Sequence, residues 1–97
     1  MKTEQILEEL KTAAQQLGHQ VRIEKGNFRG GRCVVGGEDI IMLNKRHLPE
    51  LQLVVLAQCL RGLPVDEVFL RPAVRCALED VWQRNESFEV DAADGDD

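Results

Sequence analysis

The chain is poor in aromatic residues, with no tyrosine, one tryptophan and three phenylalanines among its 97 residues. Its core must therefore be built mostly from aliphatic side chains. Long apolar runs are also absent, since no stretch approaches the ~20 apolar residues that a membrane-spanning helix requires. The first ten residues, MKTEQILEEL, lack the apolar segment of a secretory signal. We therefore expect a cytoplasmic protein that does not contact a membrane.

Cysteine is scarce and odd in number, and Cys33, Cys59 and Cys76 lie far apart in the sequence. This pattern argues against the disulfide framework of small secreted domains. Each cysteine lies within an apolar segment. We therefore predict that all three are reduced and buried, and that they act as small hydrophobic side chains.

The net charge of −5 is unevenly distributed along the chain. The first 85 residues hold 12 bases and 11 acids, whereas residues 86–97 hold six acids and no base. A segment with charge of one sign and few apolar residues is typical of disorder. Since 97 residues suffice for one hydrophobic core, we predict a single domain over residues 1–85 and a disordered acidic tail over residues 86–97.

Apolar residues recur at helical spacing from Ile6 to Leu17 and predict an amphipathic N-terminal helix. Thr3 is placed to cap its first turn. Gly18 follows the last apolar position and is placed to end the helix, because glycine readily adopts the left-handed conformation found there.

Three strands are predicted next, at His19–Lys25, Arg32–Val35 and Ile40–Leu43. The first alternates apolar and polar residues, which is typical of a strand with one buried face. The segment Gly26–Gly31 is rich in turn formers, and Gly36–Asp39 has the composition of a hairpin turn. We expect these strands to form an antiparallel sheet.

The third strand and the helix that follows it are unusually apolar. All four residues of Ile40–Leu43 are apolar, so this strand needs cover on both faces, either at the centre of the sheet or at a subunit contact. Pro49 opens a central helix that is apolar nearly all round and therefore buried on more than one side. Both features suggest a protein–protein interface or a homodimer. The candidate interface residues are Ile40, Met42, Leu53 and Leu56.

Gly62 and Pro64 end the central helix, and the segment Val65–Leu70 is compatible with either a turn or a short edge strand. Pro72 then opens a third helix with an amphipathic stripe that ends at Trp82. The sequence thus predicts an α+β domain. Its elements are an N-terminal helix, a three-stranded antiparallel sheet, a central apolar helix and a C-terminal amphipathic helix.

Basic residues are concentrated around the predicted strands, where Phe28 lies among them. Phosphate attraction combined with aromatic stacking is the mode in which many proteins hold single-stranded nucleic acid. An ordinary solvated strand face explains the same pattern, and the acidic tail is an alternative occupant of the patch. The candidate polyanion-binding residues are Arg22, Lys25, Arg29, Arg32, Lys45 and Arg46.

Motifs for catalysis, metals or nucleotides are lacking. The segment GNFRGGR differs from a phosphate loop because Arg32 and Cys33, rather than Lys and Ser or Thr, follow its last glycine. His19, His47 and the three cysteines lack the close spacing of a zinc site. Cys59 makes a poor nucleophile for a pair with His47, because an apolar helix raises the pKa of a thiol. We predict no cofactor and no metal.

The order of elements up to Gly62, with a strand ending in IIMLN before a buried helix, resembles the core of small zincin-type metallopeptidases. That family carries HExxH on the helix, often after Leu-Ala. Here Leu56-Ala57 is followed by Gln58 and Cys59 in place of the first ligand and the glutamate base, and Gly62 replaces the second ligand. The resemblance therefore implies a scaffold without the chemistry, and no zinc ligand or general base is carried over.

The leading prediction is a non-enzymatic cytosolic interaction module that dimerises or binds another protein. The first alternative is binding of nucleic acid or another polyanion through the basic residues of the sheet. The second alternative is a hydrolase of zincin ancestry.

Overall fold

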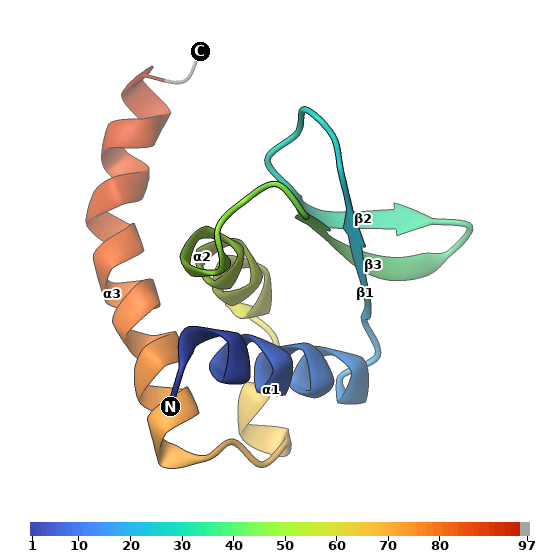
Figure 1. The fold of residues 1–97 in the computed structure, drawn as a ribbon, viewed down its shortest axis with the longest axis vertical. Helices are drawn as coiled ribbons and strands as arrows, with labels where there is room; N and C mark the ends of the chain where they lie inside the picture. The colour runs from blue at the N-terminus through green and yellow to red at the C-terminus, as the bar shows by residue number, and fades with distance from the viewer. Residues whose placement is uncertain (96–97) are drawn as a thin grey trace.

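The computed structural model describes the backbone of residues 1–95 and the side chains of residues 1–84. The elements in chain order are α1 (Thr3–Gln16), β1 (Gln20–Glu24), β2 (Gly31–Val35), β3 (Glu38–Asn44), α2 (Pro49–Leu60), the 3₁₀ turn η1 (Val65–Glu67) and α3 (Pro72–Gly95). Helices α1 and α2 pack against one face of the sheet, and α3 packs on α1 and α2 away from it (Figure 1). The α+β class is confirmed.

The sheet has the strand order β1–β3–β2, with β3 in the centre. Strands β2 and β3 form the predicted antiparallel hairpin around Gly36 and Gly37, which both have positive φ. Strand β1 instead pairs with β3 in parallel, so the prediction of an antiparallel sheet is wrong and the sheet is mixed. The strand that is apolar on both faces takes the central place, where both of its edges are hydrogen-bonded.

The core lies between the helices and one face of β3. Ile41 and Leu43 point into it and are fully buried, together with Leu10 of α1 and with Leu56 and Leu60 of α2. Removing one such side chain from water contributes about 1.5–3 kcal/mol to stability. Few aromatic residues are needed because these branched aliphatic side chains fill the interior.

Helix α1 starts one residue earlier than predicted. Its N-cap is Lys2, not Thr3, and the Lys2 backbone N–H donates to Oε1 of Gln5 at 3.0 Å. At the other end, Gly18 has φ +90°, and the N–H of His19 donates to the carbonyl of Ala14 at 2.9 Å. This glycine and this hydrogen bond end the helix in the way that the sequence predicted.

The segment after α2 forms the turn η1, and no strand follows it in the described backbone over Val68–Leu70. Helix α3 buries Val74, Leu78 and Val81 of the predicted stripe, and Nε1 of the half-buried Trp82 donates to the carbonyl of Ala57 at 2.7 Å. Its backbone is helical as far as Gly95, beyond the predicted end at residue 85. The predicted disordered tail over residues 86–97 lies outside the described side chains and stays a prediction. None of the described helices is long and apolar enough to cross a membrane.

The three cysteines differ in exposure, against the prediction that all are buried. Cys59 is buried in α2, Cys33 is half-buried, and Cys76 is exposed. Cys76 lies midway between Val74 and Leu78, the buried positions of α3, and so falls on the outward side of that helix.

Candidate functional site

The loop between β1 and β2 is fastened to the end of β3 by one buried amide. Asn44 Nδ2 donates to the carbonyl of Gly26 at 2.9 Å and to that of Phe28 at 2.6 Å. Asn44 Oδ1 accepts from the backbone N–H of Arg46 at 3.0 Å, and Gln52 of α2 donates to the Asn44 carbonyl at 2.9 Å. One side chain therefore holds both the loop before β2 and the turn after β3.

Two glycines let this loop pass close to its neighbours. A Cβ at Gly30, whose φ is +98°, would lie 2.6 Å from the carbonyl oxygen of Met42. A Cβ at Gly26 would lie 2.7 Å from ring carbons of Phe28. The loop backbone therefore lies directly against β3, and the Phe28 ring lies against the loop itself.

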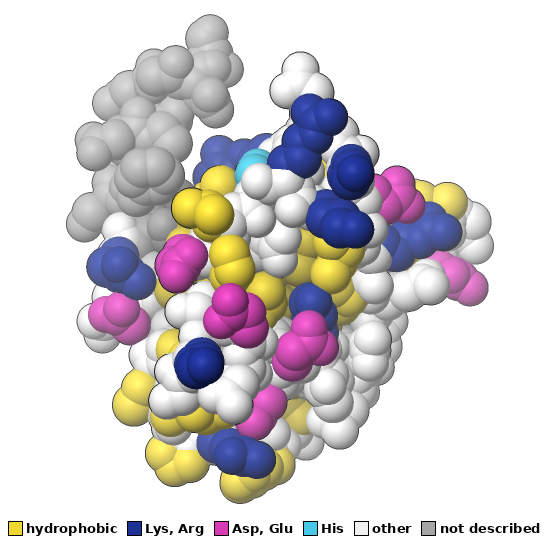
Figure 2. All heavy atoms as spheres, in the orientation of Figure 1, with side chains coloured by type: hydrophobic (Ala, Val, Ile, Leu, Met, Phe, Trp, Pro, Cys, Tyr) yellow, Lys and Arg dark blue, Asp and Glu magenta, His cyan; other side chains and the backbone are white. Residues whose placement is uncertain are grey.

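The six predicted polyanion-binding side chains are all exposed, and most of them gather where β1 and β3 end and β2 begins. Lys25 and Lys45 directly follow Glu24 and Asn44, which are paired in the sheet. Figure 2 shows Lys and Arg side chains together over the loop between β1 and β2. We call this region the basic end of the sheet, and it consists of Arg22, Lys25, Arg29, Arg32, Lys45 and Arg46.

The bases of the basic end form no ion pair with any residue whose side chain the structure describes. The acids Glu38 and Asp39 lie at the opposite, hairpin end of the sheet. Glu24 is the acidic residue beside the loop, where it lines a hollow with Arg29 and Arg32. The basic end therefore carries a local excess of positive charge.

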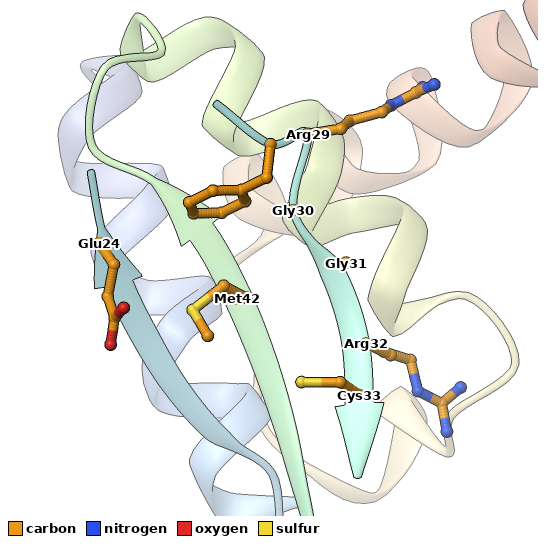
Figure 3. Close-up of a pocket in the computed structure, with 8 residues that line it drawn as sticks. Glu24, Arg29, Gly30, Gly31, Arg32, Cys33 and Met42 are labelled. Atoms are coloured by element: carbon orange, nitrogen blue, oxygen red, sulfur yellow. The ribbon is translucent and has the colours of Figure 1, made fainter. Parts of the chain in front are cut away.

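Two hollows on either side of Phe28 share that residue and Arg29 as walls. The first, of about 520 Å³, lies on the sheet face away from the helices and is mostly apolar, with Met42 and Cys33 in its lining. Figure 3 shows Met42 and Cys33 projecting from the sheet on the same side, with Arg32 on the other side of β2. The second, of about 650 Å³, is lined by Asn44, Arg46, His47 and Leu51, among others.

Strand alternation thus divides the predicted basic residues. Arg22 is paired with Met42 and shares its face, whereas Arg32 is paired with the buried Ile41 and faces α2. Arg32 borders a small hollow with Val55 and Cys59. The structure brings Arg29, Arg32 and Arg46 together around the loop but does not place Arg22 and Arg32 on one surface.

The four predicted interface residues do not form one exposed patch. Ile40 and Leu56 are only 3% and 0% exposed within their own chain, so they offer no surface to a second one. Met42 and Leu53 are partly exposed, but Met42 lies on the open face of the sheet and Leu53 packs against the core from α2. The strand and helix are covered by their own fold more fully than their composition suggests.

The positions compared with the zincin motif lie at the end of α2. Burial raises the pKa of the Cys59 thiol to about 11 against the opposing charge of Arg32, as predicted for a thiol in an apolar helix. The helix ends at Leu60, so Gly62, with φ +90°, lies beyond it. Among the described residues, no three His, Cys, Asp or Glu side chains are grouped so as to hold a metal ion.

Both histidines have a buried ring nitrogen without a hydrogen-bond partner in the described structure. His19 is 7% exposed, and its Nε2 lies 4.0 Å from Oδ2 of Asp39. His47 lies in the turn after β3 and lines the second hollow with Arg29 and Arg46. Its unpartnered ring nitrogen is Nδ1. His47 lies apart from the hollow that holds Cys59.

Sequence reasoning identified Phe28 and the bases but missed Asn44 and Gln52, and it assigned Met42 to an interface rather than to this site. A polar amide at the end of an otherwise apolar strand was the available signal, since a buried Asn requires partners. Which carbonyls it would find was not visible, because Gly26 and Phe28 lie 18 and 16 residues before it.

No protein-family model, no curated protein and no solved structure matches this chain.

Proposed function

We propose that this chain is a non-enzymatic, cytosolic interaction module that binds an anionic partner through the basic end of the sheet. One observation carries the proposal: six exposed bases lie at or near this end of the sheet, on both of its faces, and none forms an ion pair with a described residue. On the helical side, by contrast, Lys11, Arg71, Arg75 and Arg84 each form an ion pair with a carboxylate. Like charges held together repel one another, and an anionic partner relieves that repulsion.

The rigidity of the loop supports the proposal. Asn44 fixes the carbonyls on both sides of Asn27, and Gly30 fixes the approach of the loop to β3. Arg29 lies between these two anchored points. A side chain presented by an ordered loop loses less conformational entropy on binding than one on a free loop.

Inorganic polyphosphate is the simplest probe, because it carries only charge. We expect it to bind the full chain at low salt, with an affinity that falls linearly in log–log form as salt rises. Arg29→Ala should weaken binding and lower the salt slope by about one. Arg71→Ala, which removes an equal charge from the helical side, is the matched control. Absence of binding at low salt, or equal loss in both variants, would contradict the proposal.

The same samples test self-association, because the sequence also predicted that the protein forms a homodimer. Light scattering after gel filtration measures the mass of the free protein. Because Ile40 and Leu56 are buried, Met42 and Leu53 are the predicted interface residues that a second chain could contact. We test a dimer that uses Met42. Met42→Lys should then convert it to a monomer.

The acidic segment after residue 85 is an internal competitor for the basic end. Its six acids and absence of bases give it the opposite charge. Neutralising Glu86, Glu89 and Asp91 to the amides should tighten polyphosphate binding, and the gain should vanish in high salt. Unchanged affinity at low salt would show that the segment does not screen the site.

A further inference from the structure

Phe28 forms a fixed apolar wall between the two hollows. Its ring lies against the backbone of Gly26, where a Cβ would come within 2.7 Å of two ring carbons. Its own carbonyl accepts from Asn44 at 2.6 Å. The side chain is half-buried, so part of it remains accessible, and it contributes to the lining of both hollows. An aromatic residue held in this way offers a preformed stacking surface.

The two hollows beside Phe28 differ in chemistry. The first contains Met42, Cys33 and the backbone of Gly30 and Gly31, which suit a flat apolar group. The second contains Arg29, Arg46 and His47, which suit an anion. Arg29 and Arg32 also line the first hollow, but Glu24 lines it too and offsets part of their charge there.

We propose that the anionic partner is a single-stranded nucleic acid, an inference that rests on the proposed function and specifies its ligand. A base stacks against Phe28 on the Met42 side, and the adjoining phosphate lies by Arg29 and Arg46. Volumes of about 520 and 650 Å³ fall within the range of small-ligand sites. The basic side chains of Lys25, Lys45 and Arg22 extend the positive charge beyond Arg29 and Arg46. Aromatic stacking combined with a basic groove is the physical basis of single-strand binding.

An acidic peptide would use the same arginines but would gain nothing from the aromatic wall. A duplex would offer the phosphates but keep its bases stacked inside. The contribution of the nucleobases to the binding affinity therefore distinguishes a single strand from an acidic peptide or a duplex. It is measured without altering the protein by comparing a single strand with an abasic strand of the same length and charge.

The experiment measures fluorescence anisotropy of the full chain with labelled RNA and DNA strands of about 12 nucleotides, a length typical for one small domain. Abasic strands, a hairpin duplex, inorganic polyphosphate and polyglutamate are the competitors. We expect the abasic strand to bind at least about five-fold more weakly than the complete one, since stacking is worth about 1 kcal/mol or more per base. Tighter binding of RNA or of DNA supports the proposal and identifies the source.

Phe28→Leu should reduce oligonucleotide affinity by about five-fold or more while leaving polyphosphate affinity unchanged. Phe69→Leu is the matched control, because Phe69 is 83% exposed between η1 and α3. Arg46→Ala should weaken the binding of both the oligonucleotide and polyphosphate. Circular dichroism checks that each variant is folded, and the abasic comparison stands even where Phe28→Leu does not fold.

Equal affinity for complete and abasic strands, or for an oligonucleotide and polyglutamate, would overturn the nucleic-acid inference. Polyphosphate binding lost in Arg29→Ala would then still support the proposed function. If neither polyphosphate nor any oligonucleotide binds at low salt, both proposals fail.

Discussion

On the helical side of the molecule, Lys11, Arg71 and Arg84 each contact a carboxylate at 2.9–3.1 Å. At the basic end of the sheet, no base contacts a carboxylate among the described residues. The first region also contains the buried aliphatic core, whereas the second is an open strand end held by hydrogen bonds from Asn44. Charges balanced within the chain serve its stability, and charges left unbalanced are available to a partner.

The helical side should account for most of the stability. Leu56→Ala removes a fully buried side chain of α2 and should lower the free energy of unfolding by about 2–5 kcal/mol. Urea denaturation measures the loss, with Leu48→Ala, at a position 72% exposed, as the control. A small effect, or a change in oligomeric state without loss of stability, would restore Leu56 as an interface residue.

The alkylation rates of the cysteines depend on how deeply each thiol is buried. Raising the pKa of Cys59 from 9.0 to about 11 leaves about 100-fold less thiolate at pH 8, so alkylation should be slow there and accelerate towards pH 11. The folded state favours the protonated thiol, so its contribution to stability is complete below pH 9 and is lost between pH 9 and 11. Pulse alkylation with mass spectrometry should label the exposed Cys76 before Cys59. Early labelling of Cys59 would show that the region around α2 opens readily.

The order of the loop at the basic end of the sheet should depend on the side-chain amide of Asn44. Asn44→Ala leaves the carbonyls of Gly26 and Phe28 without their donor and should cost about 1–3 kcal/mol. Hydrogen exchange of the loop amides should accelerate, and polyphosphate affinity should fall because Arg29 is no longer held. The exposed Asn27 lies in the same loop and lines the second hollow, so Asn27→Ala is the control for stability and hydrogen exchange, and it should change neither of them. Equal behaviour of the two variants would exclude Asn44 as the anchor.

The smallest effects should come from single charges, and they separate the two regions most directly. Arg71→Ala breaks a surface ion pair and should lower stability by about 0.5 kcal/mol without changing polyanion binding. Arg29→Ala should leave stability within about 0.5 kcal/mol and weaken binding. Thermal melts and polyphosphate titrations of both variants complete the test. The comparison fails if Arg71→Ala weakens polyphosphate binding as much as Arg29→Ala does.

Much of the fold follows from short-range patterns. The stripe of α1 with Gly18 after it, the hairpin around Gly36 and Gly37, and the start of α2 at Pro49 are readable because periodicity, glycine and proline act within a few residues. The apolar run Ile40–Leu43 predicted either a central strand or a subunit contact, and the structure places it at the centre of the sheet. The direction of β1 was not readable, because a five-residue strand fits either orientation and the choice depends on how the following loop crosses β3.

The candidate site divides in the same way. The excess of bases around Phe28 is a property of the sequence. Which of them share a surface depends on strand register, and the fastening of their loop depends on hydrogen bonds from Asn44 to residues 16 and 18 positions away. The burial of Ile40 and Leu56 was likewise decided by the fold, because neighbouring strands and helices supply the cover that composition alone did not reveal. The sequence thus determined which chemistry is present, and long-range packing decided which of it reaches the surface.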